Sequence, residues 1–448
     1  MSPSFAGATG RPDSFSLTEK DVSFADAVGA RPAAHGRGLK ASTAAPRPRL
    51  LVLGSYAPGT GFTRVLEALV ENAAQQWEVH WVGVSYEGEP VGVRGAHLYP
   101  VIPGGGDVFG AFRACEVALA VRPAAVVVLH DIWHLGRYAR TLRPKIGGAR
   151  LLAYFPLDGR LRDGTLVAPL AAFDGLATYT AGARADLLAA AAGLGDGAGL
   201  PPVAIVPHGV DSAVFRPLPA LAEGGFERAA RRGATARVFP HLAASEHPFV
   251  VLNPGRPAQR KRMDLTLEGF ALFARDKPPG VRLCLHQAIS DASHREKALD
   301  GARALGIADR LELDPLGSRR LDDDELNLLY NACDVGLSTS MGEGWGLATW
   351  EHAAAGGAQV VPDHSACGEL WRGRAELVPL SRRVVPWFSP LEMGEVEAAA
   401  VAAALERLYG SPDLLRERCR QAYTWASLPA HGWGAAAASF LAWLGQQA

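Results

Sequence analysis

The sequence predicts an α/β protein made of two doubly wound, Rossmann-like domains that face each other across a cleft. The first observation is that short apolar stretches alternate with segments of helical periodicity along most of the chain. This alternation is typical of parallel sheets covered by helices. The second is that the pattern lapses between residues 216 and 247 and then begins again. The third is the length of 448 residues, which exceeds one ordinary hydrophobic core.

These observations divide the chain into five expected segments. Residues 1–47 are rich in Ala, Gly, Ser, Pro and Arg without periodicity, which predicts a disordered leader. Residues 48–215 form the first domain, 216–247 a linker with one helix near 226–232, and 248–428 the second domain. Residues 429–448 are expected to form a C-terminal helix that packs back on the first domain.

Composition argues against several functional classes. A formal net charge of −1 provides no global field for nucleic acid or an anionic membrane. The five cysteines are scattered without zinc spacing, which indicates reduced, mostly buried thiols and a cytoplasmic location. No apolar stretch approaches the ~18 residues of a membrane-spanning helix. The basic residues of 137–150 predict a solvated helix face, and weak association with a membrane surface is the alternative.

The first domain opens with an apolar strand at 50–53, a glycine loop through Gly59 and Gly61, and a helix. Because the loop is not GxGxxG, a dinucleotide site is disfavoured, and a structural turn and a ligand contact both stay open. The strand at 126–129 delivers His130 to its carboxyl end, where open α/β sheets bind ligands. A core or capping histidine is the alternative. Further strands are expected at 79–84, 151–155, 175–179 and 204–206, with a helix at 111–121.

The second domain repeats the alternation. Its strands are expected at 249–252, 281–285, 311–313, 335–337 and 359–361, with helices after 264, over 322–333 and from 347. A helical tail begins at 396, breaks near Pro429 and then resumes. Asp322 to Asp324 open a predicted helix, so we interpret them as its N-terminal cap and not as a pair of metal ligands.

The chain is organised around residues 338–357. Glycines at 342, 344 and 346 follow a buried strand, and a helix starts at Leu347. Free N–H groups and the positive end of the helix dipole therefore make an anion site. Glu343 and Glu351 would repel a phosphate, so we expect them to face hydroxyl groups of the ligand, which carboxylates bind well. A phosphate and a polyol held together describe a sugar nucleotide.

A basic loop follows the strand at 249–252. The fork of Arg256 and the point charge of Lys261 suit a diphosphate that lies in the same cleft. A solvated basic loop is the alternative, above all for Arg260 and Arg262.

Several of these motifs resemble those of a known family. Glu343-Gly-Trp-Gly-Leu with Glu351 resembles the E-x7-E signature of retaining GT-B glycosyltransferases, specifically glycosyltransferase family 4. Arg256 and Lys261 fit that family's R-x4-K, residues 207–217 resemble its interdomain element, and the 59–61 loop lies where its first loop does. The chain departs from the family pattern at Thr60, Trp345 and Arg262.

The resemblance implies a GT-B fold in which the second domain holds a nucleotide-sugar donor and the first an acceptor. Glu343 would then hold hydroxyl groups of the donor sugar and Glu351 the ribose. Arg256, Lys261 and the N–H groups of Gly346 and Leu347 would bind the diphosphate. His130 would contact the donor sugar near the reaction centre. The remaining predicted donor contacts are Gly59, Gly61, Gly344 and Trp345.

The predicted function is a metal-independent, retaining transfer of a hexosyl unit from a nucleotide-diphosphate sugar to an acceptor hydroxyl, without a cofactor. The acceptor is a glycan, a lipid-linked sugar or a small molecule. The alternatives are a GT-B-type sugar phosphorylase or nucleotide-sugar epimerase, and a non-catalytic nucleotide-sugar binder. Donor base, donor sugar and oligomeric state are left open, because pocket shape and loops determine them.

Overall fold

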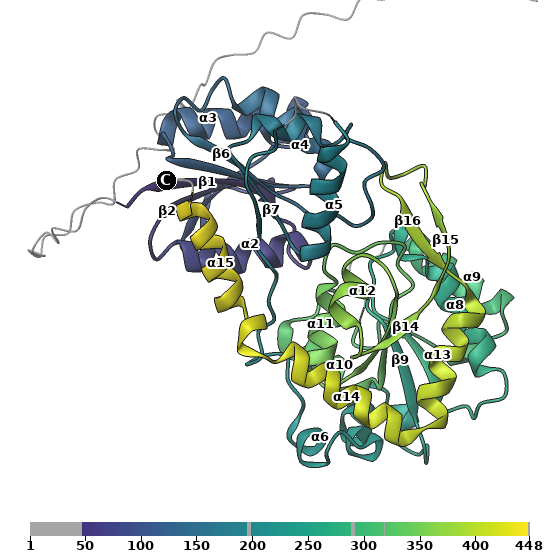
Figure 1. Ribbon diagram of the computed structural model, residues 1–448. Coiled ribbons are helices and arrows are strands. Elements are labelled where there is room, and N and C mark those ends of the chain that lie inside the picture. The colour runs from purple at the N-terminus through teal and green to yellow at the C-terminus, as the bar shows by residue number, and fades with distance from the viewer. Residues whose placement is uncertain (1–46, 195–198, 288–291, 318, 447–448) are drawn as a thin grey trace, which may run out of the picture. The chain divides into compact units, whose positions relative to one another are not determined.

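A computed structural model describes residues 47–194, 199–287, 292–317 and 319–446. Apart from Arg47, the predicted leader lies outside these described residues. The described chain contains two mainly parallel sheets, each covered by helices (Figure 1). This is the two-part α/β architecture that the alternating pattern predicts.

The first sheet has eight strands in the order β3-β4-β2-β1-β5-β6-β7-β8, and all neighbours are parallel except β3 and β4. Side chains of the central strand β1 alternate between two buried clusters, with Leu50 and Val52 in one and Leu51 and Leu53 in the other. Burial on both faces explains why these strands are uninterrupted apolar stretches. The strands are β1 (Arg49–Ser55), β2 (Glu78–Val84), β3 (Val91–Val93), β4 (Ala96–Pro100), β5 (Ala125–Leu129), β6 (Arg150–Tyr154), β7 (Gly175–Thr178) and β8 (Val203–Ile205), and the helices α2 (Gly61–Ala73), α3 (Ala111–Val121), α4 (Ile132–Leu142) and α5 (Ala181–Ala192).

The second sheet has six parallel strands in the order β11-β10-β9-β12-β13-β14. Its central strand β9 is buried along Phe249 to Leu252. The predicted cap of α10 is confirmed, because Asp322 and Glu325 form a reciprocal capping box. The strands are β9 (Phe249–Asn253), β10 (Val281–Leu285), β11 (Leu311–Leu313), β12 (Val335–Leu337), β13 (Ala358–Pro362) and β14 (Glu376–Val378), and the helices α8 (Met263–Ala274), α9 (Ala292–Ala304), α10 (Asp323–Ala332), α11 (Leu347–Ala354), α12 (Ser365–Trp371), α13 (Ala398–Gly410) and α14 (Pro412–Ala426).

Two segments join the halves. Between the sheets the chain forms α6 (Pro219–Glu223) and α7 (Arg232–Val238) with short 3-10 turns. After α14 the last helix, α15 (Trp433–Gln446), returns to the first sheet and lies beside α2 (Figure 1). Its Phe440 and Trp443 belong to the same buried cluster as Leu50, and its Leu444 carbonyl accepts a hydrogen bond from Arg150 at 2.7 Å.

A hairpin of β15 (Leu380–Val384) and β16 (Met393–Val396) extends from the second half to the first. The backbones of Arg160 and Glu392 pair across the halves, with N–H···O distances of 2.8 and 3.0 Å. Leu391 is 1% exposed and packs among residues of the first half. The sequence pattern did not predict this hairpin.

Two compositional predictions can be compared with the structure. The five cysteines are unpaired and buried, as predicted. No helix in the described part of the chain combines the length and apolar character needed to cross a membrane.

Candidate functional site

A cavity of about 510 Å³ lies between the two halves and is lined by both. The first half contributes residues from the glycine loop before α2 and from the carboxyl ends of β5 and β6. The second half contributes the basic loop after β9, the glycine loop before α11 and the tip of the β15–β16 hairpin. All predicted site residues except His130 line it: Gly59, Gly61, Arg256, Lys261, Glu343, Gly344, Trp345, Gly346, Leu347 and Glu351.

The glycine loop needs its glycines for conformation and for space. Gly346 directly precedes α11 and has a φ of 93°, which side chains disfavour. A Cβ on Gly344 would lie 2.7 Å from the Cβ of Pro156 in the other half. The loop therefore closes against the first half, and the residues at the start of α11 line the cavity.

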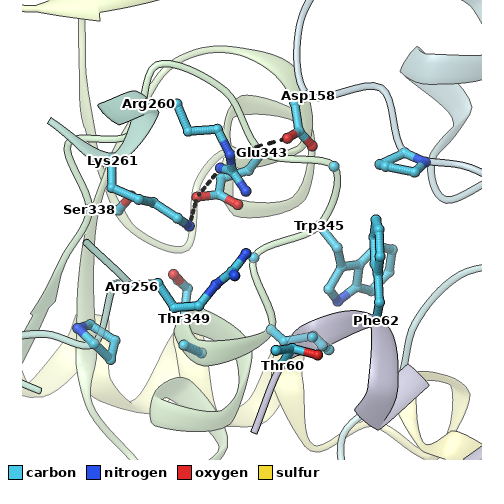
Figure 2. Close-up of a pocket in the computed structure, with 18 of the residues that line it drawn as sticks. Thr60, Phe62, Asp158, Arg256, Arg260, Lys261, Ser338, Glu343, Trp345 and Thr349 are labelled. Atoms are coloured by element: carbon cyan, nitrogen blue, oxygen red, sulfur yellow. Dashed lines mark hydrogen bonds and ion pairs between the residues drawn. The ribbon is translucent and has the colours of Figure 1, made fainter. Parts of the chain in front are cut away.

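Glu343 lies at the centre of an ion-pair network (Figure 2). Lys261 donates a hydrogen bond to its carboxylate, and Arg260 approaches the same oxygen at 3.3 Å. Arg260 also contacts Asp158 of the first half at 3.3 Å and donates to the Gly342 carbonyl at 2.7 Å. The alternative interpretation of Arg260 as a solvated residue of a basic loop is therefore wrong. This arginine joins a carboxylate from each half.

Arg262, the other arginine left open, points elsewhere. It pairs with Asp264 at 2.7 Å and with Glu395 of the hairpin at 2.5 Å. These contacts fix the base of the hairpin.

Charge dominates the titration of Glu343. Burial by itself would raise the pKa of this carboxyl, but Lys261 and Arg260 outweigh burial and lower the pKa to about 2. Burial lowers the pKa of Lys261, against the opposing effect of Glu343. Glu343 is therefore ionised at neutral pH.

Arg256 differs from its basic neighbours. Its guanidinium forms no hydrogen bond or ion pair with any described side chain, and Figure 2 shows it reaching into the cavity. Burial and then the nearby Arg260 lower the pKa of Arg256, so the site favours an incoming anion there.

The second acid, Glu351, is held from both halves. Arg64 of α2 reaches across to it at 3.3 Å and also pairs with Asp323 at 2.6 Å. The hydroxyl of Tyr330 donates to the other carboxylate oxygen at 3.0 Å. Burial raises the pKa of Glu351 although Arg64 opposes it. Since a carboxylate offers about four acceptor positions, room remains for a diol.

His130 is the predicted residue that the cavity does not include. Its ring packs against Phe109, His134 and Tyr138, with centroid distances of 5.5, 4.5 and 5.6 Å. Its Nδ1 accepts a hydrogen bond from the backbone N–H of Asp131 at 2.8 Å. Burial and then His134 lower the pKa of His130 to about 3.

Asp131, the residue after His130, does line the cavity. Burial first, and then the Asp158 carboxylate, raise the pKa of Asp131 to about 7.

Three aromatic side chains form part of the cavity wall. His208 packs against Tyr179 and Trp345, with centroid distances of 4.0 and 5.4 Å. Burial lowers the pKa of His208 to about 3, so its imidazole is neutral. All three rings line the cavity.

Sequence reasoning missed several side chains of the cavity. Arg64 looked like an ordinary polar position on an amphipathic helix. Asp131 and Asp158 carried a usable signal, because they come two and three residues after a predicted strand end. The charged residues that were missed or left open are Arg64, Asp131, Asp158 and Arg260.

Comparisons with known proteins agree with this geometry. The family described as "Family 4 Glycosyltransferase in conflict systems" matches residues 214–440, just over half of the chain. A curated relative, D-inositol 3-phosphate glycosyltransferase of Thermomonospora curvata, is 31% identical over 160 residues. That match covers 34% of each protein, so the chain spans about a third of the length of this relative.

Solved structures share the fold. Sucrose-phosphate synthase from Thermosynechococcus elongatus has a TM-score of 0.64 at 16% identity and covers 89% of this chain and 98% of its own. HepE of Anabaena, solved with UDP-glucose, has a TM-score of 0.64 at 13% identity and covers 89% and 100%. A UDP-forming trehalose-phosphate synthase from Burkholderia xenovorans has a TM-score of 0.62 at 15% identity and covers 89% and 98%. At these identities the likeness shows the fold, a GT-B arrangement of two Rossmann-like domains.

Proposed function

The chain belongs to the family 4 glycosyltransferases of conflict systems, and we propose that it transfers a hexosyl unit from a nucleotide-diphosphate sugar to an acceptor hydroxyl, with retention of anomeric configuration and without a metal ion. The single observation that carries the proposal is the convergence of two acids and two bases on one cavity. Glu343, Glu351, Arg256 and Lys261 come from separate parts of the second half and line the same space.

The cations and the start of α11 suit the diphosphate. Arg256 has no other partner among the described residues, and Lys261 can share its hydrogen bonds between Glu343 and a phosphate oxygen. The N–H groups of Gly346 and Leu347 complete an anion site at a helix N-terminus. Positive groups preorganised at the leaving group stabilise the charge that develops there.

The acids suit the neutral parts of the donor. Glu343 would accept hydrogen bonds from hydroxyls of the transferred sugar, and Glu351 would accept them from the ribose. Gly59 and Gly61 of the first half bound the same cavity and leave space for the diphosphate. In this arrangement the donor lies mainly on the second half and the acceptor enters from the first.

The reaction follows from this placement. The bond between the anomeric carbon and the phosphate oxygen breaks through an oxocarbenium-like state. The acceptor oxygen bonds to the anomeric carbon on the same face, and its proton passes to the departing phosphate. Family membership and the resemblance of the motifs support this retaining course.

A thermal-shift screen of UDP, GDP, ADP and their sugars tests the donor. A ligand at 100 times its Kd raises the free energy of unfolding by about 2.7 kcal/mol. We expect one nucleoside diphosphate to stabilise the chain and its sugar to do so further. Stabilisation by none of them would refute the proposal.

Two further measurements test the finer claims. Proton NMR of the product should show the donor's anomeric configuration, and inversion would refute retention. Activity should persist in excess EDTA, and loss that added Mg²⁺ or Mn²⁺ restores would refute metal independence.

A further inference from the structure

The charged side chains of the cavity fall into two groups. Three ion pairs satisfy most of them: Asp158 with Arg260, Glu343 with Lys261, and Glu351 with Arg64. Among the described residues, the side chains of Asp131 and Arg256 have no hydrogen-bond or ion-pair partner although both line the cavity. Arg256 suits the diphosphate of the proposed donor, which leaves the Asp131 carboxylate without a ligand group.

The backbone at the start of α4 forms no capping hydrogen bond with the Asp131 side chain. Asp131 is the N-cap residue of α4, where an aspartate usually accepts hydrogen bonds from the first helical N–H groups. No such capping bond forms here. The turn is held instead by the hydrogen bond from the Asp131 N–H to the ring of His130. The carboxylate is therefore available to the cavity.

The surroundings specify the kind of group that Asp131 can bind. Asp158 lies near it on the first half, while Arg256 and Arg260 act on it from the second half. A phosphate would be repelled by the two carboxylates. A neutral hydroxyl can donate a hydrogen bond to Asp131 without adding charge. Burial and Asp158, which together raise the Asp131 pKa to about 7, also keep the group close to its titration point at neutral pH.

Other residues that line the cavity suit a compact ring. Trp133 and Pro156 line the cavity from the first half, and Phe388 and Ser389 of the hairpin line it from the second. Apolar faces next to a carboxylate are complementary to a polyol ring, which has hydroxyl edges and C–H faces. The hairpin is anchored on the first half through Leu391 and Glu392, so this wall has a fixed position.

We propose that Asp131 is a further catalytic residue, the group of the first half that accepts a hydrogen bond from the attacking hydroxyl of a neutral polyol acceptor. The inference rests on the proposed function. Asp131 orients an oxygen lone pair toward the anomeric carbon. The new bond joins that oxygen to the anomeric carbon as the bond to the phosphate oxygen breaks, and the single hydroxyl proton then passes from its hydrogen bond with Asp131 to the departing phosphate oxygen.

The test compares Asp131→Asn with a control, Glu116→Gln, which removes an exposed carboxylate of α3 in the same half. The probe is the nucleotide sugar that gives the largest thermal shift, with water and methyl α-D-glucopyranoside as hydroxyl donors. For Asp131→Asn we expect turnover at least 100-fold below that of the unaltered chain. The affinities for the nucleotide sugar and its nucleoside diphosphate should stay within about twofold. The control should match the unaltered chain.

Three results would overturn the inference. Unchanged turnover would show that Asp131 does not touch the attacking group. Weaker binding of the nucleotide sugar with unchanged binding of the nucleoside diphosphate would assign Asp131 to the donor sugar. A lower melting temperature of Asp131→Asn would show a structural role, because removing a half-buried carboxylate that has no partner among the described residues should leave stability unchanged or raise it. Failure of the unaltered chain to turn over any nucleotide sugar would contradict the proposed function itself.

Discussion

Replacing Glu343 by glutamine separates the two contributions of this residue, to the fold and to the donor. Glu343 is 7% exposed, and its carboxylate faces Lys261 and Arg260. Glutamine keeps the shape and can still accept one hydrogen bond, but it removes the charge that both cations use. We therefore expect a loss of stability in the empty protein together with a loss of catalysis.

The magnitude follows from the pKa. The ordinary value of 4.5 falls to about 2 in the folded chain, a difference of about 2.5. At about 1.4 kcal/mol for each pH unit, ionised Glu343 contributes at most about 3 to 4 kcal/mol. Because the folded pKa is depressed, this contribution is complete above pH 4.5 and disappears as pH falls through 4.5 toward 2. The difference between the two proteins should therefore be constant from pH 8 to about 5.5 and shrink below pH 4.5.

Urea unfolding at several pH values measures this difference, and Glu406→Gln is the matched control. Glu406 pairs with Lys277 on the surface with half of its side chain exposed, so its loss should cost less than about 1 kcal/mol. Equal stability of Glu343→Gln and the unaltered chain at pH 7 would refute the electrostatic reasoning, as would a difference that grows toward acid. Circular dichroism would confirm that the variant is folded before turnover is compared.

The same substitution should also change donor binding and turnover. Glu343→Gln frees Lys261 and Arg260 from their common carboxylate, so the affinity for a nucleoside diphosphate should not fall. The additional affinity provided by the sugar should fall, and turnover should drop at least 100-fold. Near-normal transfer by a folded variant would remove Glu343 from the mechanism.

Three further predictions concern other groups of the cavity. Lys261→Ala should weaken binding of the nucleoside diphosphate roughly 10- to 100-fold, since a hydrogen bond to a charged group contributes about 1.5–3 kcal/mol; an unchanged calorimetric Kd would argue against its role. Arg64→Met should lower the free energy of unfolding by about 3 kcal/mol, because it leaves the Glu351 carboxylate buried without its cation. The double variant Arg64→Met/Glu351→Gln should recover most of that loss, and additive losses in a double-mutant cycle would contradict the pairing. Turnover should fall as pH is lowered through about 7, because protonation removes the acceptor form of Asp131; a profile that Asp131→Asn leaves unchanged would assign that ionisation elsewhere. The charged groups that act on Asp131 are Asp158, Arg256 and Arg260.

Most of the core strands could be predicted from the sequence for a simple physical reason. A strand buried on both faces, such as β5 (Ala125–Leu129), has to be apolar at every position. The β15–β16 hairpin carries no such signal. Its strands are short, β15 carries Arg382 and Arg383, and its stability depends on Leu391 entering the core of the other half. Partners distant in sequence determine such an element, and local pattern does not contain them.

The same distinction holds for the site. Glu343, Glu351, Arg256 and Lys261 follow strands of one sheet, so their approach to one edge was predictable from topology. Their partners were not. Arg64 of the first half reaches the carboxylate of Glu351, which lies far along the chain in the second half. An arginine on the polar face of a helix looks the same whether water or another domain covers it.

The positions of His130 and Asp131 show that one residue at the end of a strand determines which side chain reaches the cavity. Leu129 ends β5, and the chain then turns into α4 with Asp131 in an extended conformation at φ −62° and ψ 143°. Side chains on either side of such a turn point to opposite layers. His130 therefore packs against Tyr138 of α4, and Asp131 lines the cavity. Periodicity locates the turn within a residue or two, which is not enough to choose between neighbours. The choice matters because a neutral imidazole both donates and accepts, whereas a carboxylate only accepts, so the substrate must supply the hydrogen.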